Sequence, residues 1–125
     1  MACLVSVALV IACSSVAFTG RNRMLLYSDS EIASLSNESY NEMMTTAKVS
    51  DNKAQSAMIQ EVGERITTAL TKYLASKGEL SLLEGINWSF RLVSDDQVNA
   101  FCMPGGQGVF YEGIMPLLDT PDLVA

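Results

Sequence analysis

The stretch that decides the fold lies near the end of the chain, at residues 99–111, and reads NAFCMPGGQGVFY. Residues 98–103 form a run with strand-forming side chains, Pro104-Gly105-Gly106 supplies a turn, and residues 107–111 form a second such run. Glycines provide the positive φ angles that a tight hairpin needs. The pattern therefore predicts a β-hairpin whose strands meet at the Pro-Gly-Gly turn.

A further strand is predicted just before this hairpin, at residues 88–93, where large apolar and polar side chains alternate. Ser94-Asp95-Asp96 ends it. Two adjacent carboxylates on a turn are usually solvated, and neighbouring residues at a strand end point to opposite sides. Asp95 and Asp96 are therefore interpreted as a solvated turn, and neither a cation site nor a catalytic carboxylate pair is predicted there.

Two helices are predicted upstream of the strands. Ser28 and Glu31 form a capping box that opens the first helix, which ends near Thr46. The second helix carries apolar residues every four positions, at Met58, Val62, Ile66, Leu70 and Leu74. It stops at Lys77-Gly78, where a cation and a glycine complete the last turn. Gly63, inside this helix, either marks a close approach to a neighbouring element or is simply tolerated.

After the hairpin, residues 114–118 predict a short turn of helix, and Thr120-Pro121-Asp122 opens a further helix with an N-cap, a first-turn proline and an acidic side chain. The order helix, helix, strand, hairpin, helix is an α+β arrangement. At Ala125, the last predicted helix has completed only about one turn. We therefore expect these 125 residues to be the front part of a longer protein.

Composition excludes several functions. The net charge of -6, with only 8 scattered Lys and Arg residues, argues against a nucleic-acid partner. There is no histidine, so no Ser-His-Asp or Cys-His catalytic set and no His-ligated metal is present in these residues. The three cysteines lack the C-x-x-C spacing of a zinc or redox site. Cys102 is expected to be a small buried hydrophobic residue.

The N-terminal segment, residues 1–12, is an uncharged apolar run with the length of a signal-peptide core, shorter than the roughly 20 residues of a bilayer-spanning helix. Val10-Ile11-Ala12 before Cys13 resembles the bacterial lipobox, which implies a lipidated Cys13 and a chain held on a membrane. No Lys or Arg lies near Met1, so a cleaved signal, a short anchor and a buried core segment remain alternatives. The predicted organisation is a signal peptide at 1–13, a tether at 14–27 and a domain at 28–125.

The hairpin and its flanks carry a resemblance to a known family. Asp95 to Phe101, then Pro104-Gly105-Gly106, then Val109 to Ile114 together resemble the M48 family of zinc metallopeptidases. In that family, such a strand and Pro-Gly-Gly hairpin precede an active-site helix that carries His-Glu-x-x-His. No such motif occurs in these residues. The resemblance implies a zincin-like N-terminal part whose catalytic residues and single zinc ion lie beyond Ala125.

The same resemblance implies a function: hydrolysis of peptide bonds in extracytoplasmic proteins, such as misfolded envelope proteins, on the periplasmic side of a bacterial envelope. This part of the chain would supply the substrate edge, since a strand beside the cleft can pair with an extended peptide. The candidate substrate-binding residues are Asn99, Ala100, Phe101, Pro104, Gly105 and Gly106. The alternative is a non-catalytic lipoprotein that binds a partner through the same edge.

Overall fold

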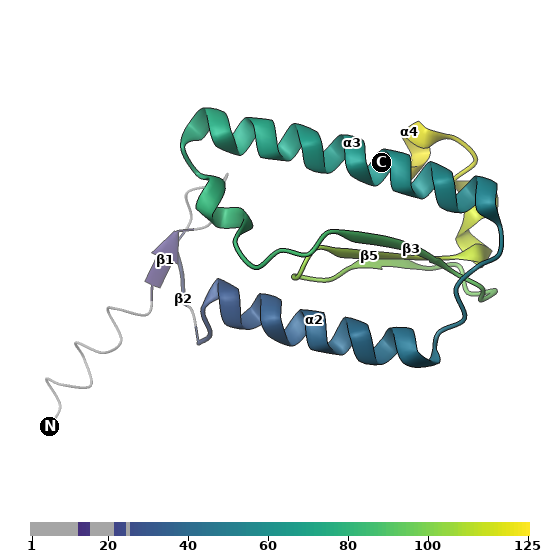
Figure 1. Ribbon diagram of the computed structural model, residues 1–125, viewed down its shortest axis with the longest axis horizontal. Coiled ribbons are helices and arrows are strands. Elements are labelled where there is room, and N and C mark those ends of the chain that lie inside the picture. The colour runs from purple at the N-terminus through teal and green to yellow at the C-terminus, as the bar shows by residue number, and fades with distance from the viewer. Residues whose placement is uncertain (1–12, 16–21, 25) are drawn as a thin grey trace, which may run out of the picture.

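The structure is a computed structural model, and it describes residues 13–15, 22–24 and 26–125. Its larger part is a small three-stranded sheet with one long helix on each face, α2 (Asp29–Thr46) and α3 (Lys53–Lys77) (Figure 1). The predicted α+β class is confirmed at this level. The predicted signal peptide lies outside the described residues, apart from Cys13. Within the described ranges, no helix combines the length and apolar character needed to cross a bilayer.

The start of α2 and the end of α3 carry the predicted signals, and Asn52 adds a cap at the start of α3 that was not predicted. Ser28 caps α2 through the complete capping box: its hydroxyl accepts from the Glu31 N–H, and the Glu31 carboxylate accepts from the Ser28 N–H. Asn52 caps α3 by accepting from the Gln55 N–H. Gly78, with a φ of 70°, ends α3 in the left-handed conformation that glycine adopts without strain.

The sheet consists of β3 (Ser89–Val93), β4 (Ala100–Cys102) and β5 (Gln107–Tyr111). β5 lies in the middle, paired antiparallel with β4 and parallel with β3. The predicted hairpin is confirmed, and Gly106 has the positive φ, 96°. The parallel pairing of β3 with β5 was not predicted, because it depends on residues 94–99 carrying the chain past β5 to the far edge.

The faces of the sheet form two separate cores. Toward α2, Tyr40 packs with Val93 and Val109. Toward α3, Ile59 packs with Leu92 and with Met115 of η2 (Glu112–Leu117). Leu92 and Val93 are thus both buried although they are adjacent. Strand 88–93 was predicted to be half-buried, but a strand covered by helices on both faces buries both sets of side chains at its covered end.

Gly63 marks a close approach. A Cβ atom at this position would lie 2.3 Å from Cδ2 of Phe90, so the missing side chain lets α3 lie directly on the β3 ring. The interpretation of Gly63 as merely tolerated is therefore wrong. The contact sets the distance between helix and sheet.

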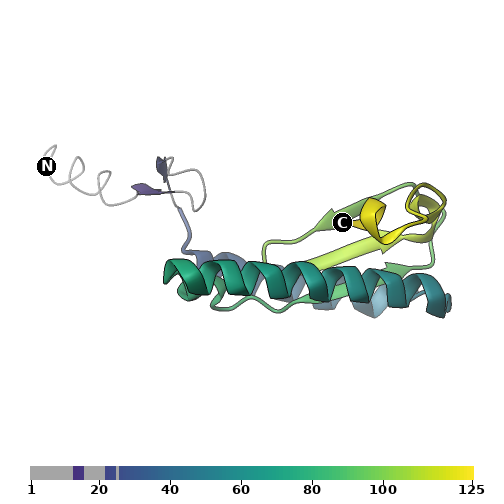
Figure 2. The same ribbon diagram turned by 90° about the horizontal axis from the view of Figure 1, so that it is seen from above.

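Five shorter elements complete the described part. A 3-10 turn, η1 (Leu80–Leu83), links α3 to β3, and α4 (Pro121–Val124) follows η2 with Thr120 at its N-cap and Pro121 in its first turn. The segment predicted to be an irregular tether contains a short antiparallel pair, β1 (Cys13–Ser15) with β2 (Asn22–Met24). Figure 2 shows β4 and β5 extending to one side of the two long helices.

Candidate binding edge at β4

The two outer strands of the sheet differ in how their edges are covered. Along β3, the Ser50 N–H donates to the Leu92 carbonyl at 2.9 Å and the Ser94 N–H to the Lys48 carbonyl at 2.8 Å. The Gln60 amide covers the Phe90 carbonyl farther along. The linker between α2 and α3 thus closes this edge. Among the described residues, no strand pairs with the outer side of β4. The β4 edge is therefore the open one.

The register of β4 shows which backbone groups face outward. The Tyr111 N–H donates to the Asn99 carbonyl at 3.1 Å, and the Met103 N–H donates to the Gln107 carbonyl at 2.7 Å. Hydrogen-bonded pairs alternate along an antiparallel ladder, so Phe101 opposite Val109 is the pair between them. The N–H and C=O groups of Ala100 and Cys102 consequently point away from β5. They form a short template for an added strand.

The Pro-Gly-Gly turn is held firmly by the rest of the chain. The Gly105 N–H donates to the Ser36 hydroxyl on α2 at 2.9 Å, and the Gly105 carbonyl accepts from the Asn87 N–H at 2.7 Å. The Gly106 carbonyl accepts from the Ser89 N–H at 3.2 Å. The Gly106 N–H donates to the Met103 carbonyl. The backbone N–H and C=O groups of both glycines are therefore all hydrogen-bonded within the chain.

A buried polar cluster between α2 and β5 fixes this turn. Gln107 is only 2% exposed, and its side-chain oxygen accepts from the Ser36 hydroxyl at 3.1 Å while its amide donates to Asn37. A buried polar group must be paired, so these side chains specify one position of the turn against α2. Sequence reasoning missed this cluster. The available signal was a polar Gln107 at an inward position of an otherwise apolar strand.

The six candidate residues therefore differ in what they contact. Asn99 is exposed and Ala100 presents its outward backbone groups at the edge. Phe101 packs inward against the α2-side core, with its ring centroid 6.1 Å from that of Tyr111. Pro104, Gly105 and Gly106 form the turn. The edge available to a ligand thus begins at Asn99 and Ala100 and continues to Cys102.

Cys102 is exposed, so its interpretation as a buried hydrophobic residue is wrong. It lies on the outer strand, opposite Gly108, and Gly108 has no side chain to cover it. Burial of a cysteine depends on what lies beyond the strand. Composition alone could not show that β4 forms an edge.

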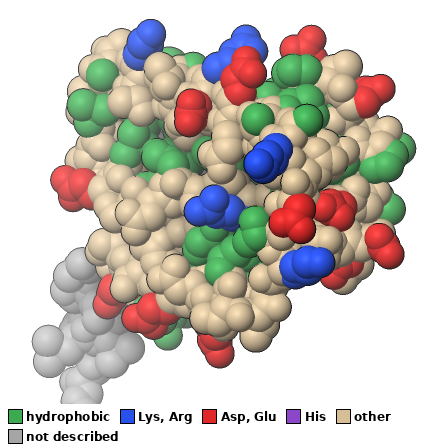
Figure 3. Space-filling view, turned by 45° about the vertical axis from the view of Figure 1, so that its right-hand side comes forward, with side chains coloured by type: hydrophobic (Ala, Val, Ile, Leu, Met, Phe, Trp, Pro, Cys, Tyr) green, Lys and Arg blue, Asp and Glu red, His purple; other side chains and the backbone are tan. Residues whose placement is uncertain are grey.

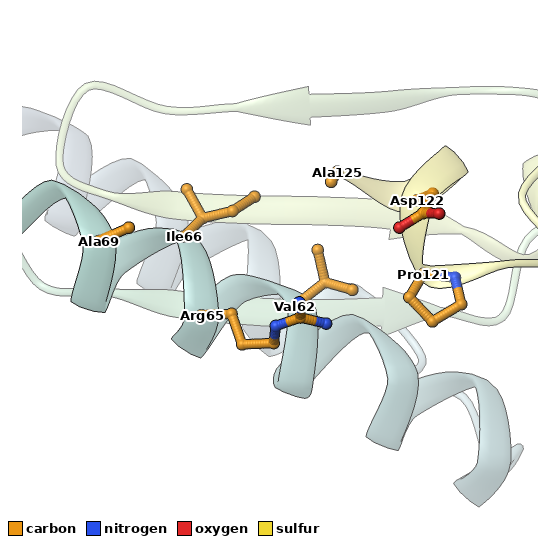
Figure 4. A pocket seen from close by; sticks show the side chains of 7 residues that line it. All are labelled: Val62, Arg65, Ile66, Ala69, Pro121, Asp122 and Ala125. Carbon is orange, nitrogen blue, oxygen red and sulfur yellow. The ribbon is translucent and has the colours of Figure 1, made fainter.

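An apolar groove runs beside the edge, on the α3 face of the sheet. It has a volume of about 270 Å3, and Ile66, Trp88, Phe90, Cys102, Phe110 and Val124 are among its lining residues. An adjoining hollow of about 270 Å3 lies between α3 and α4 (Figure 4). The Arg65 side chain extends along α3 there, and Asp122 lies on α4. On the face seen in Figure 3, acidic and basic side chains are interspersed with hydrophobic ones.

Metal ligands are not gathered in this part of the protein. Within the described residues, no group of three or more His, Cys, Asp or Glu side chains could hold a metal ion. The Asp95 carboxylate accepts from the N–H and the side-chain amide of Gln97, which makes it part of a turn. The residues described here do not fit a zinc ion.

No protein-family model matches the chain, and no curated protein matches it. The resemblance to the M48 family therefore rests on the residues of the hairpin and its flanks.

Proposed function

We propose that the chain is the N-terminal part of a membrane-associated zinc metalloendopeptidase of the M48 type, in which β4 presents its outer edge to an extended polypeptide substrate. The observation that carries this proposal is the pair of outward-facing residues, Ala100 and Cys102, on the uncovered edge of the sheet. Backbone pairing of this kind holds a substrate without requiring a particular sequence. That suits an enzyme that hydrolyses misfolded envelope proteins.

The catalytic apparatus has a defined place in this proposal. The described residues do not fit zinc, so the ion and its His-Glu-x-x-His ligands would belong to the continuation of the chain beyond Ala125. The residues of this part bind and orient the substrate strand. Ser36 and Gln107 hold the turn at the end of β4 in place through hydrogen bonds made within the chain.

A matched pair of proline variants tests the edge in the full-length protein. Ala100→Pro removes an outward N–H and should lower kcat/KM for an unfolded protein substrate by roughly three- to tenfold, the equivalent of one hydrogen bond, while the fold persists. Phe101→Pro removes the inward N–H and should lower the unfolding midpoint instead. Unchanged kcat/KM for Ala100→Pro would exclude β4 as the substrate edge.

The alternative, a non-catalytic lipoprotein, would use the same open edge to bind a partner strand. Zinc content and downstream sequence separate the two functions. The peptidase requires a reading frame that continues into His-Glu-x-x-His and about one zinc ion per purified full-length chain. A stop codon after Ala125, together with zinc-free purified protein, would leave only the partner-binding function.

A further inference from the structure

Four large apolar side chains are exposed at one end of the molecule. Leu26 is 87% exposed and Tyr27 58%, just before α2 begins; Leu80 is 48% exposed and Leu82 44%, in the turn that follows α3. Figures 1 and 2 both place the start of α2 and the end of α3 at the same end of the molecule. We call these four residues the end patch.

Local structure keeps the four side chains of the end patch exposed to solvent. Ser28 caps α2, so Leu26 and Tyr27 lie outside the helix and its packed face. Gly78 reverses the chain in the left-handed conformation, and η1 then turns back toward the sheet with the Leu82 N–H donating to the Glu79 carbonyl at 3.1 Å. Leu83 is half-buried, whereas Leu80 and Leu82 face solvent. Apolar side chains gathered in this way indicate a contact surface.

The β1–β2 pair brings the lipidation candidate to this end. Cys13 is the register partner of Met24, so their Cα atoms lie about 5 Å apart. Leu26 follows Met24 by two residues, a span of at most about 7 Å. The 14–27 segment therefore does not separate the anchor from the domain by its full extended length. The Cα atom of Cys13, the candidate for lipidation, therefore lies within about 12 Å of the Cα atom of Leu26 in the end patch.

We propose that the end patch rests on the lipid surface to which the N-terminal segment attaches the chain. This rests on the proposed membrane attachment, and adds to it a contact made by the folded domain itself. The occupant is a bilayer because the apolar run 1–12 and Cys13 join the domain beside the patch. Leucine and tyrosine are side chains suited to the boundary between headgroups and acyl chains.

The charges around the end patch specify the kind of lipid. The carboxylates on the segments that carry it are Asp29, Glu31, Glu79 and Glu84, and the cations are Lys77 in the last turn of α3 and Arg21 and Arg23 just before Leu26 in the sequence. The carboxylates outnumber the cations only slightly, so attraction to anionic headgroups contributes little to this contact. The contact is therefore mainly apolar, does not require anionic lipid and depends little on salt. With this end on the bilayer, β3 and β5 run away from the membrane and β4 runs toward it, so the Pro-Gly-Gly turn lies nearer the lipid than the start of β4.

Methyl NMR of the full chain in phosphatidylcholine nanodiscs tests the contact. The nanodiscs carry a lipid with a nitroxide on its upper acyl chain, and spectra are compared before and after the nitroxide is reduced. The methyl signals of Leu26, Leu80 and Leu82 should be lost with the active nitroxide. The signals of Leu117, which is 64% exposed at the end of η2, the turn that follows the far end of β5, should persist.

Two variants sharpen the result. Leu26→Ser with Tyr27→Ser should restore much of the Leu80 and Leu82 signals, whereas Val98→Ser with Leu117→Ser should leave the losses unchanged. Persistent Leu80 and Leu82 signals in nanodisc-bound chain, equal loss at Leu117, or broadening that appears only with anionic lipid would each overturn the proposal. The mass of Cys13 and the zinc content are measured separately, so failure of lipidation or of the peptidase function is distinguished from failure of the patch.

Discussion

At Gly63, a single hydrogen in place of a side chain sets the distance between α3 and the sheet. Gly63→Ala should gain about 1 kcal/mol of helix propensity but force a Cβ atom to within 2.3 Å of the Phe90 ring. Overpacking of this kind costs about 1–3 kcal/mol. We expect a net loss of about 1 kcal/mol in the free energy of unfolding, measured by urea titration.

Removal of the Phe90 side chain provides the control for this prediction. In a Phe90→Ala background the ring is gone, so Gly63→Ala should stabilise the protein through helix propensity alone. A destabilisation that persists in this background would show that Gly63 serves something other than the contact with Phe90.

Single residues also show where the sequence was insufficient. The exposure of Cys102 follows from the position of β4 at the edge of the sheet, and that position follows from the pairing of β3 with β5. Strand pairing between distant segments leaves no mark in local periodicity. By contrast, a close approach at Gly63 was one of the two interpretations that the sequence offered.

At the scale of elements, the α2 capping box makes stability depend on pH. Hydrogen bonds from the Ser28 side chain and then from its backbone N–H lower the pKa of Glu31. A lowered folded-state pKa gives stability that is present above the unfolded value, about pH 4.3, and is lost as pH falls through the folded value. Glu31→Gln should therefore be less stable than the parent at pH 7 and equal to it in strong acid.

The capping partner provides the check on this pH dependence. Thermal unfolding midpoints of the parent and of Glu31→Gln are compared across the acid range, and the comparison is repeated with Ser28→Ala present in both proteins. Without the Ser28 hydroxyl, most of the pH-dependent difference between the two proteins should vanish. A difference of unchanged size would mean that Glu31 acts through the Ser28 backbone N–H or the helix dipole and not through the Ser28 hydroxyl.

Element boundaries were largely predictable because their signals are local. Ser28 and Asn52 each cap the start of a helix through a side-chain oxygen, and Gly78 ends α3 through its positive φ angle. The candidate edge was predictable only in part: the hairpin was evident from Pro104 to Gly106, whereas the buried bond from Ser36 to Gln107 joins residues 71 positions apart. A polar Gln107 at an inward strand position indicates that a buried partner is needed, but no local pattern identifies Ser36 as that partner.

At the scale of the whole molecule, the helices cover the two faces of the sheet unequally. Leu92 and Ile59 are buried on the α3 side, yet Ile66 is 47% exposed and Trp88 42% where the groove opens. The helix stripe that predicted burial from Met58 to Leu74 is thus only partly covered among the described residues. The open apolar groove is a property of the assembled fold, since it appears only when α3, the sheet and α4 are in place.

An apolar groove left open in water should bind an apolar dye and weaken the cooperativity of unfolding. We expect the 125-residue chain to enhance the fluorescence of anilinonaphthalene sulfonate in native buffer and to melt with a broad transition. Ile66→Ser should reduce the dye signal by removing a wall of the groove, whereas the comparable change Leu117→Ser at the far end should not. The contrary result would be a sharp melting transition, well-dispersed NMR spectra and no increase in dye fluorescence. It would show that α3 and the sheet close the groove in solution.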